Sequence, residues 1–135
     1  MVREVTSVEQ YGTNNSGNIR RYTIASDATI AIGTILKLAS PRTASASTGT
    51  SDLFAGIASE AHNGTDYSTS ISTWTDGIYE FTASGAITAG DKVATAAPGN
   101  YVMSLAANTS SHAIVIGYAL KSVATNVRVQ VRVNI

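Results

Sequence analysis

Hydrophobic residues recur at every second position along much of this chain, which is the period of a β-strand. The pattern is strictest near the C-terminus, where valines alternate with polar residues from 127 to 134. This strand should bury its valines and present a polar face that carries Arg128 and Arg132. Weaker patterns predict further strands at 19–24, 32–39, 54–61, 67–75, 78–82, 92–96, 101–105 and 113–121. The sequence therefore predicts an all-β fold.

Turn residues divide these strands. Asn63-Gly64 lies between two predicted strands, and Asp76-Gly77 immediately precedes another. Both dipeptides tolerate the positive backbone angles of tight turns, so each predicts a β-hairpin. Residues 40–52 are small and polar and include no large apolar side chain. They are expected to form an exposed loop.

A weak internal repeat runs through the sequence. Residues 30–36 resemble residues 87–93, and Gly56-Ile57-Ala58 recurs as Gly117-Tyr118-Ala119 in the same order. Each unit offers a turn glycine that leads into a strand, followed by a strand whose glycine permits close backbone approach. A solenoid needs about three repeats. Unless the recurrence is a coincidence, two similar halves are instead expected to close a single compact β-barrel or barrel-like sandwich.

The N-terminal region differs in composition from the rest. Residues 11–18 are rich in Gly, Asn and Ser and resemble a linker between a short arm, 1–10, and the folded body. The expected division is an N-terminal arm and linker at 1–17 and a β-barrel domain at 18–135. Removing the arm is expected to leave the stability of this domain nearly unchanged.

The arm contains the candidate site residues of the chain. Val2, Val5 and Val8 are apolar, and a segment of ten residues cannot bury them by itself. Pairing with an exposed strand edge of a neighbouring subunit or of another protein is one way to cover them. Arg3 and Glu4 would then fix the register. The arm is accordingly a candidate partner-binding segment, and the alternative is disorder.

The amino-acid composition limits the classes of partner and site that are expected. The chain has 135 residues, the usual size of one domain, and its nine basic residues balance its nine acidic ones. Nucleic-acid binders normally carry a basic surplus, so nucleic acid is not an expected partner. Cysteine is absent, which excludes disulfides and thiolate metal sites. No apolar run reaches the length of a membrane span, so no membrane partner is expected.

Catalytic patterns are not recognisable. His62 adjoins a predicted turn and is expected to be a solvated loop residue, while His112 suits the edge of a strand. Two isolated histidines make a poor metal site. The chain has neither a nucleophile elbow nor a phosphate-binding glycine loop. Turn capping accounts for most of the scattered acidic residues. No enzyme activity, cofactor or metal is therefore predicted.

Aromatic residues leave one binding function open. Trp74, with Tyr67 and Tyr79 nearby in sequence, would suit a platform for sugars or bases. The competing interpretation is that Trp74 is a core or interface residue, since its large surface is normally buried.

From residue 18 to the end, the sequence resembles the small head-decoration, or capsid cement, proteins of tailed bacteriophages. The resemblance lies in the turn-and-strand motifs at 30–38, 54–58, 76–81, 86–93, 116–119 and 127–129. It implies a compact β-barrel, usually trimeric, that binds the major capsid protein on the outer surface of the virion head, at three-fold or quasi-three-fold positions, without enzyme activity or cofactor. The N-terminal extension, 1–17, departs from the family pattern.

The function predicted from the sequence is thus that of a structural virion protein that decorates and stabilises a phage head. Two alternatives share the fold class. One is another virion or surface module, such as a tail or fibre domain. The other is a carbohydrate-binding β module built around Trp74.

Overall fold

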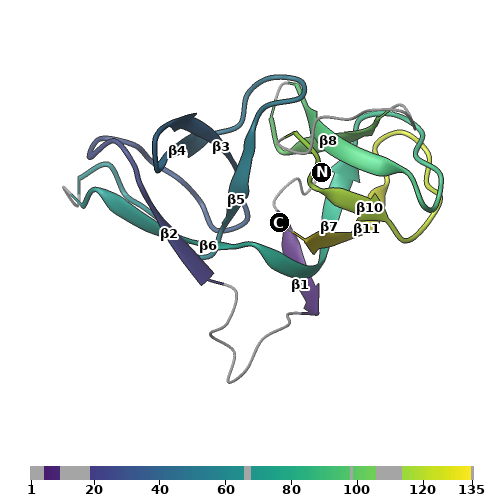
Figure 1. The fold of residues 1–135 in the computed structure, drawn as a ribbon, viewed down its shortest axis with the longest axis horizontal. Helices are drawn as coiled ribbons and strands as arrows, with labels where there is room; N and C mark the ends of the chain where they lie inside the picture. Colours follow the sequence, from purple (N-terminus) through teal and green to yellow (C-terminus); the bar gives the residue numbers. More distant parts are fainter. Residues whose placement is uncertain (1–4, 10–18, 66–67, 98, 106–113, 135) are drawn as a thin grey trace.

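A computed structural model describes residues 5–9, 19–65, 68–97, 99–105 and 114–134 (Figure 1). These residues form β-strands joined by turns and contain no helix. The strands are β1 (Thr6–Glu9), β2 (Ile19–Thr23), β3 (Ile35–Ser40), β4 (Thr43–Ala46), β5 (Phe54–Ala58), β6 (Ser70–Trp74), β7 (Asp76–Ala83), β8 (Lys92–Ala96), β9 (Tyr101–Ser104), β10 (Gly117–Ala119) and β11 (Arg128–Asn134). The predicted all-β class is confirmed.

The strands form two closed barrels that lie side by side (Figure 1). Barrel 1 has the strand order β2-β4-β3-β5-β6, and barrel 2 has the order β7-β9-β8-β10-β11. The connectivity is the same in both. In each barrel the first strand pairs parallel with the third and antiparallel with the fifth. Strand β1 is added to barrel 2 outside this closed set, on β7.

The internal repeat corresponds to these two barrels. Gly33 and Gly90 adopt equivalent positive φ angles of 87° and 93°. Their N–H groups donate to the carbonyl oxygens of Ala58 and Ala119, at 2.9 and 2.8 Å. Isolated bridges are also equivalent, joining Ile30 to His62 in barrel 1 and Ile87 to Val123 in barrel 2. The two similar halves are present, but each closes its own barrel instead of half of a single one.

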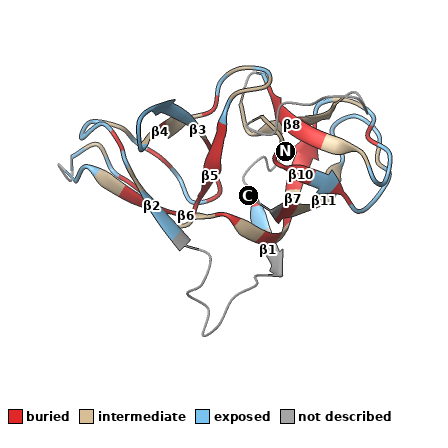
Figure 2. Cartoon of the chain, in the orientation of Figure 1, coloured by how far each residue is buried: buried red, intermediate tan, exposed pale blue. Residues whose placement is uncertain are grey.

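Two hydrophobic clusters follow from this arrangement. The smaller one fills barrel 1 and includes Leu36 and Ile71. The larger one fills barrel 2 and also takes in Ile35 and Ile57 from barrel 1. Strand β5 is therefore buried along its whole length, as Figure 2 shows. A strand covered on both faces needs a continuous apolar run, which explains the sequence Phe-Ala-Gly-Ile-Ala at 54–58.

One of the two predicted hairpins is wrong. Asp76-Gly77 is not a turn, because β7 begins at Asp76 and only Thr75 separates it from β6. The two strands belong to different barrels and do not pair, so the chain crosses directly from barrel 1 to barrel 2. Strands β5 and β6 do pair antiparallel around Asn63-Gly64, but the connection between them spans 59–69 and is no tight hairpin.

The expected exposed loop at 40–52 is also wrong, because it contains strand β4. This strand pairs with β3 and, at Thr43, with β2, and so closes barrel 1. Ala44 and Ser47 are buried. The side chains of this strand are small and only weakly hydrophobic, so the sequence pattern did not reveal a strand that closes the barrel.

Asp52 anchors the turn after β4. Its carboxylate accepts hydrogen bonds from the Ser47 hydroxyl at 2.8 Å and the Gly49 N–H at 3.0 Å. Partial burial would raise the pKa of Asp52. The hydrogen bonds from Gly49 and Ser47, with the charge of Lys37, outweigh it and hold the pKa below its ordinary value. The ionised form is therefore the one that stabilises the fold.

Substituting Asp52→Asn should lower the free energy of unfolding by about 1 kcal/mol at neutral pH, the usual worth of such hydrogen bonds. A carboxyl whose pKa is lowered on folding contributes stability above its unfolded pKa and loses it as pH falls through its folded pKa. The difference between Asp52→Asn and wild type should thus shrink as the pH falls below about 3.9, the ordinary pKa of an aspartate, and vanish once the folded carboxyl is protonated. Urea titrations at several pH values measure it.

Asp27→Asn, at an exposed turn position, is the matched control and should stay within about 0.5 kcal/mol of wild type. A pH-independent loss at Asp52 would show that the charge of its carboxylate is not what holds the turn.

Candidate functional site

The candidate arm residues fall partly within the described chain. Val2, Arg3 and Glu4 lie outside the described residues. Val5 is 2% exposed, belongs to the larger hydrophobic cluster, and donates its N–H to the Gly33 carbonyl oxygen at 2.8 Å. Val8 lies in β1, of which only the backbone is described at that position. Residues 5–9 therefore add a strand to barrel 2 and contact barrel 1 through Gly33.

Strand β1 occupies part of one edge of β7. It pairs antiparallel with residues 78–80 of β7. Thr6 lies opposite Glu80, Ser7 lies opposite Tyr79, and a bulge precedes Glu9. The other part of the same edge, at Thr82 and Ala83, pairs with β9 and closes the barrel. Strand β1 is the terminal strand of this sheet. Its second edge is thus the outer edge of this sheet in the described part of the chain.

The alternation predicted for the C-terminal strand is confirmed from Arg128 onwards, whereas Val127, which precedes the strand, is 45% exposed. Val129, Val131 and Val133 of β11 are buried, and Arg128 and Arg132 lie on the opposite face. This cationic face is used within the molecule, because both arginines are partly buried and bonded to neighbouring strands.

Arg128 and Arg132 connect β11 to the strands beside it. The Arg128 guanidinium donates to the Thr6 hydroxyl at 3.1 Å and to the Glu80 carbonyl oxygen at 3.1 Å, which ties β1 and β7 to β11. Arg132 forms an ion pair with Asp76 at the start of β7. These contacts orient the N-terminal strand and the crossing between the barrels.

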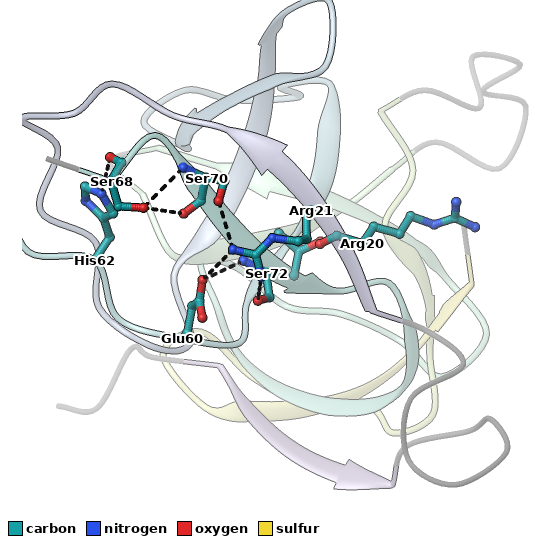
Figure 3. A network of polar contacts seen from close by, with 8 residues as sticks. Arg20, Arg21, Glu60, His62, Ser68, Ser70 and Ser72 are labelled. Atoms are coloured by element: carbon teal, nitrogen blue, oxygen red, sulfur yellow. Dashed lines mark hydrogen bonds and ion pairs between the residues drawn. The ribbon is translucent and has the colours of Figure 1, made fainter. Parts of the chain in front are cut away.

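A second polar cluster lies on barrel 1, and the sequence pattern did not single it out (Figure 3). The Arg21 guanidinium on β2 donates to the hydroxyls of Ser70 and Ser72 on β6, at 2.8 and 2.9 Å. It also lies 3.6 Å from the Glu60 carboxylate, which accepts the Ser72 N–H at 3.0 Å. Exposed ion pairs of this kind contribute about 0–1 kcal/mol, so the cluster is chiefly a surface feature.

His62 is not the solvated loop residue that the sequence suggested. It is 4% exposed, and its ring lies between two carbonyl oxygens, with Nδ1 2.5 Å from Ala28 and Nε2 2.7 Å from Ser68. Carbonyl oxygens only accept, so both contacts are hydrogen bonds when the ring carries two protons. His62 occupies the bridge position of Val123 in the repeat, and Val123 is itself partly buried against the larger hydrophobic cluster. His112 lies outside the described residues.

Two residues of the proposed aromatic platform, Trp74 and Tyr79, are described, and both lie in or against the larger hydrophobic cluster. Tyr79 is fully buried and donates its hydroxyl to the Asp76 carbonyl oxygen at 2.7 Å. Burial raises the pKa of this phenol, and the Asp76 carboxylate raises it further. Trp74 packs against the larger cluster and stacks on Tyr79 with a centroid distance of 5.6 Å. The core interpretation of Trp74 therefore fits the structure, and Tyr67 lies outside the described residues.

Turn capping accounts for the acidic residue Asp91. Its carboxylate accepts the Thr88 N–H at 3.0 Å and the Ser104 hydroxyl at 2.8 Å, and these bonds lower its pKa. Within the described ranges, no group of three or more His, Asp or Glu side chains is arranged to hold a metal ion. The same part of the chain contains no helix long and apolar enough to cross a membrane.

Comparison with known proteins identifies the family. The sequence from residue 15 to residue 135 matches the family described as phage cement protein. No curated protein sequence matches the chain. Among solved structures, the chain is similar to the head fiber gp8.5 N base of bacteriophage phi29, with a TM-score of 0.55 and 14% identity, over 86% of this chain and 92% of that one.

At 14% identity the phi29 structure shows a common fold. The family match covers both barrels, whereas residues 1–14, which include β1, lie outside it. The predicted resemblance to capsid cement proteins is thereby confirmed. The chain belongs to the phage cement protein family and is a structural, capsid-stabilising component of a phage virion.

Proposed function

We propose that the protein binds the outer surface of the assembled phage head as a homotrimer, through the major capsid protein, and acts without catalysis. The observation that carries the proposal is the family match over both barrels. The surface is compatible with extensive protein contacts, because several large apolar side chains remain exposed. They are Ile32, Leu38, Leu53, Tyr118, Leu120 and Val127.

The physical basis of stabilisation is mass action. A protein that binds the assembled shell, and not its dissociated subunits, stabilises the shell by about 2.7 kcal/mol per site at a hundredfold excess over its Kd. The same contribution recurs at every equivalent site on the head, so moderate affinity is sufficient. Two small closed barrels suit this role, because closure leaves few strand edges for aggregation.

The N-terminal segment is proposed to link subunits. Barrel 2 closes without β1, and β1 covers only part of the β7 edge. The same pairing can therefore form with β7 of a neighbouring subunit, with Val5 buried there in the same way. Val2, Arg3, Glu4 and Val8 would then contribute to contacts around this exchanged strand.

Head binding is the direct test. Purified protein mixed with undecorated heads should sediment with them and raise the temperature at which they break open, since the bound state is stabilised. Sedimentation equilibrium of the free protein should give the mass of a trimer.

Electron microscopy of labelled virions distinguishes the alternatives. Label over the whole head supports the proposal. Label confined to the tail or to fibre tips, or no sedimentation of the protein with heads, would contradict it.

A further inference from the structure

The equivalence of the barrels allows β2 to be compared with β7 residue by residue. Thr23 and Thr82 correspond, because each is the site of parallel pairing with the third strand of its barrel. Counting back along both strands, Arg21 corresponds to Glu80 and Arg20 to Tyr79. The pairing of β2 with β6 and of β7 with β11 gives the same alignment.

The corresponding edges differ in what covers them. In barrel 2, residues 78–80 of β7 pair with β1. In barrel 1, β2 pairs with β6 on one edge and with β4 only at Thr23 on the other. No strand in the described ranges pairs with residues 19–21 on this second edge. Barrel 1 thus has an open edge where barrel 2 receives an additional strand.

The backbone of this edge is oriented for strand addition. The Thr23 N–H donates to the Arg42 carbonyl oxygen on the β4 side. Because N–H directions alternate along a strand, the N–H groups of Ile19 and Arg21 point to the same side. They face away from β6. In barrel 2 the residue that corresponds to Arg21 is Glu80 of β7, and it pairs there with Thr6. An extended peptide can therefore pair here as β1 does in barrel 2.

The side chains around the edge are cationic. Arg20 is exposed, and its guanidinium has no partner among the described residues. Figure 3 shows it pointing away from the cluster in which Arg21 contacts Glu60, Ser70 and Ser72. Arg42 lies over the Tyr22 ring, 5.8 Å from its centroid. A docked segment would thus meet an unneutralised arginine, and a carboxylate is its natural counterpart.

We propose that residues 19–21 of β2 bind, by strand addition, an extended segment of the shell protein that carries a carboxylate next to Arg20. The inference rests on the proposed function, since it assigns the contact through which the barrel meets the shell. The backbone supplies the affinity, and the charge of Arg20 selects an acidic segment.

Charge reversal at Arg20 is the test, with undecorated heads as the probe. Arg20→Glu should weaken head binding at least about tenfold, and Arg20→Lys, which keeps the charge, should stay within about threefold of wild type. Lys121→Glu is the matched control. It makes the same charge change at an exposed position on barrel 2 and should stay within about threefold as well.

Hydrogen exchange supplies a second measurement on the wild-type protein. Strand addition should slow exchange of the Arg21 amide at least about tenfold in the head-bound protein, because that amide becomes a donor to the new strand. Unchanged exchange at residues 19–23, or equal binding of Arg20→Glu and wild type, overturns the inference while the proposed function stands. Failure of the wild type to bind heads overturns both.

Discussion

Gly117→Ala should reduce the free energy of unfolding by about 3 kcal/mol, because it forces β10 away from β11. A Cβ atom at Gly117 would lie 1.9 Å from the backbone oxygen of Arg132, well inside van der Waals contact. Gly117 pairs directly with Val133 of β11, so the obstacle is the backbone of a central barrel strand. A backbone atom cannot rotate aside as a flexible side chain can, and the barrel has to distort.

Denaturant unfolding of the variant measures this loss. Gly85→Ala is the control, since a Cβ there meets nothing within 4 Å, and it should change stability by no more than about 0.5 kcal/mol. The repeat supplies a second case in Gly56, where a Cβ would lie 2.9 Å from Thr73 and φ is 155°. Equal stability of Gly117→Ala and Gly85→Ala would refute the close-approach explanation.

The glycines also explain why the repeat could be recognised in the sequence. Turn glycines such as Gly33 and Gly90, and close-approach glycines such as Gly117, are required by backbone geometry. Glycine occupies these positions in both halves of the repeat, although the surrounding side chains differ. The number of barrels could not be predicted, because a sequence repeat does not show whether its two halves form one barrel together or one barrel each. Whether each half closes its own barrel depends on the parallel pairings at Thr23 and Thr82, and no local sequence pattern indicates those pairings.

Strand β4 and the pairing of β1 with its own chain were not predicted, for different physical reasons. Strand β4 consists of Thr and Ser alternating with Ala, so it lacks the large apolar side chains that reveal a strand, although Ala44 is buried. Strand β1 follows the expected alternation poorly, and its pairing partner lies about seventy residues away in sequence. Hydrophobic periodicity reports burial against a large core, so strands held by backbone pairing in narrow or peripheral places escape it.

The candidate site was predicted only in part. The sequence identified the arm and the cationic face of β11, since apolar and charged residues stand out in a lightly charged chain. It did not reveal that Arg128 and Arg132 bond to neighbouring strands, nor that Arg20 stays exposed beside an open edge. Those outcomes depend on register, and register emerges only when the barrel closes.

Deleting residues 1–9 should lower the free energy of unfolding by about 3 kcal/mol, in contrast to the expectation from sequence that removing the arm leaves the stability of the domain nearly unchanged. The loss has three sources: burial of Val5, the backbone pairing of β1 with β7, and the contact of Arg128 with Thr6. Full burial of a valine alone contributes about 1.5–3 kcal/mol. Thermal and denaturant unfolding of the truncated chain measure the change.

Two matched valine substitutions test the docking of β1 in a chain of full length. Val5→Ala, at a buried position, should cost about 2 kcal/mol, whereas Val127→Ala, at a position that is 45% exposed, should cost less than about 0.5 kcal/mol. Equal effects of the two substitutions would show that β1 does not bury Val5 in solution.

Protein concentration then decides whether β1 docks on its own chain or on a neighbour. A strand exchanged between subunits couples folding to association, so the Tm of the full chain should rise with concentration. The chain lacking residues 1–9 should lose that dependence along with its trimeric mass, and Val5→Ala should shift assembly to higher concentration. A strand that folds back on its own barrel gives a Tm independent of concentration and leaves assembly intact after deletion. That result would exclude exchange and confine β1 to stabilising the contact between the two barrels of a single subunit.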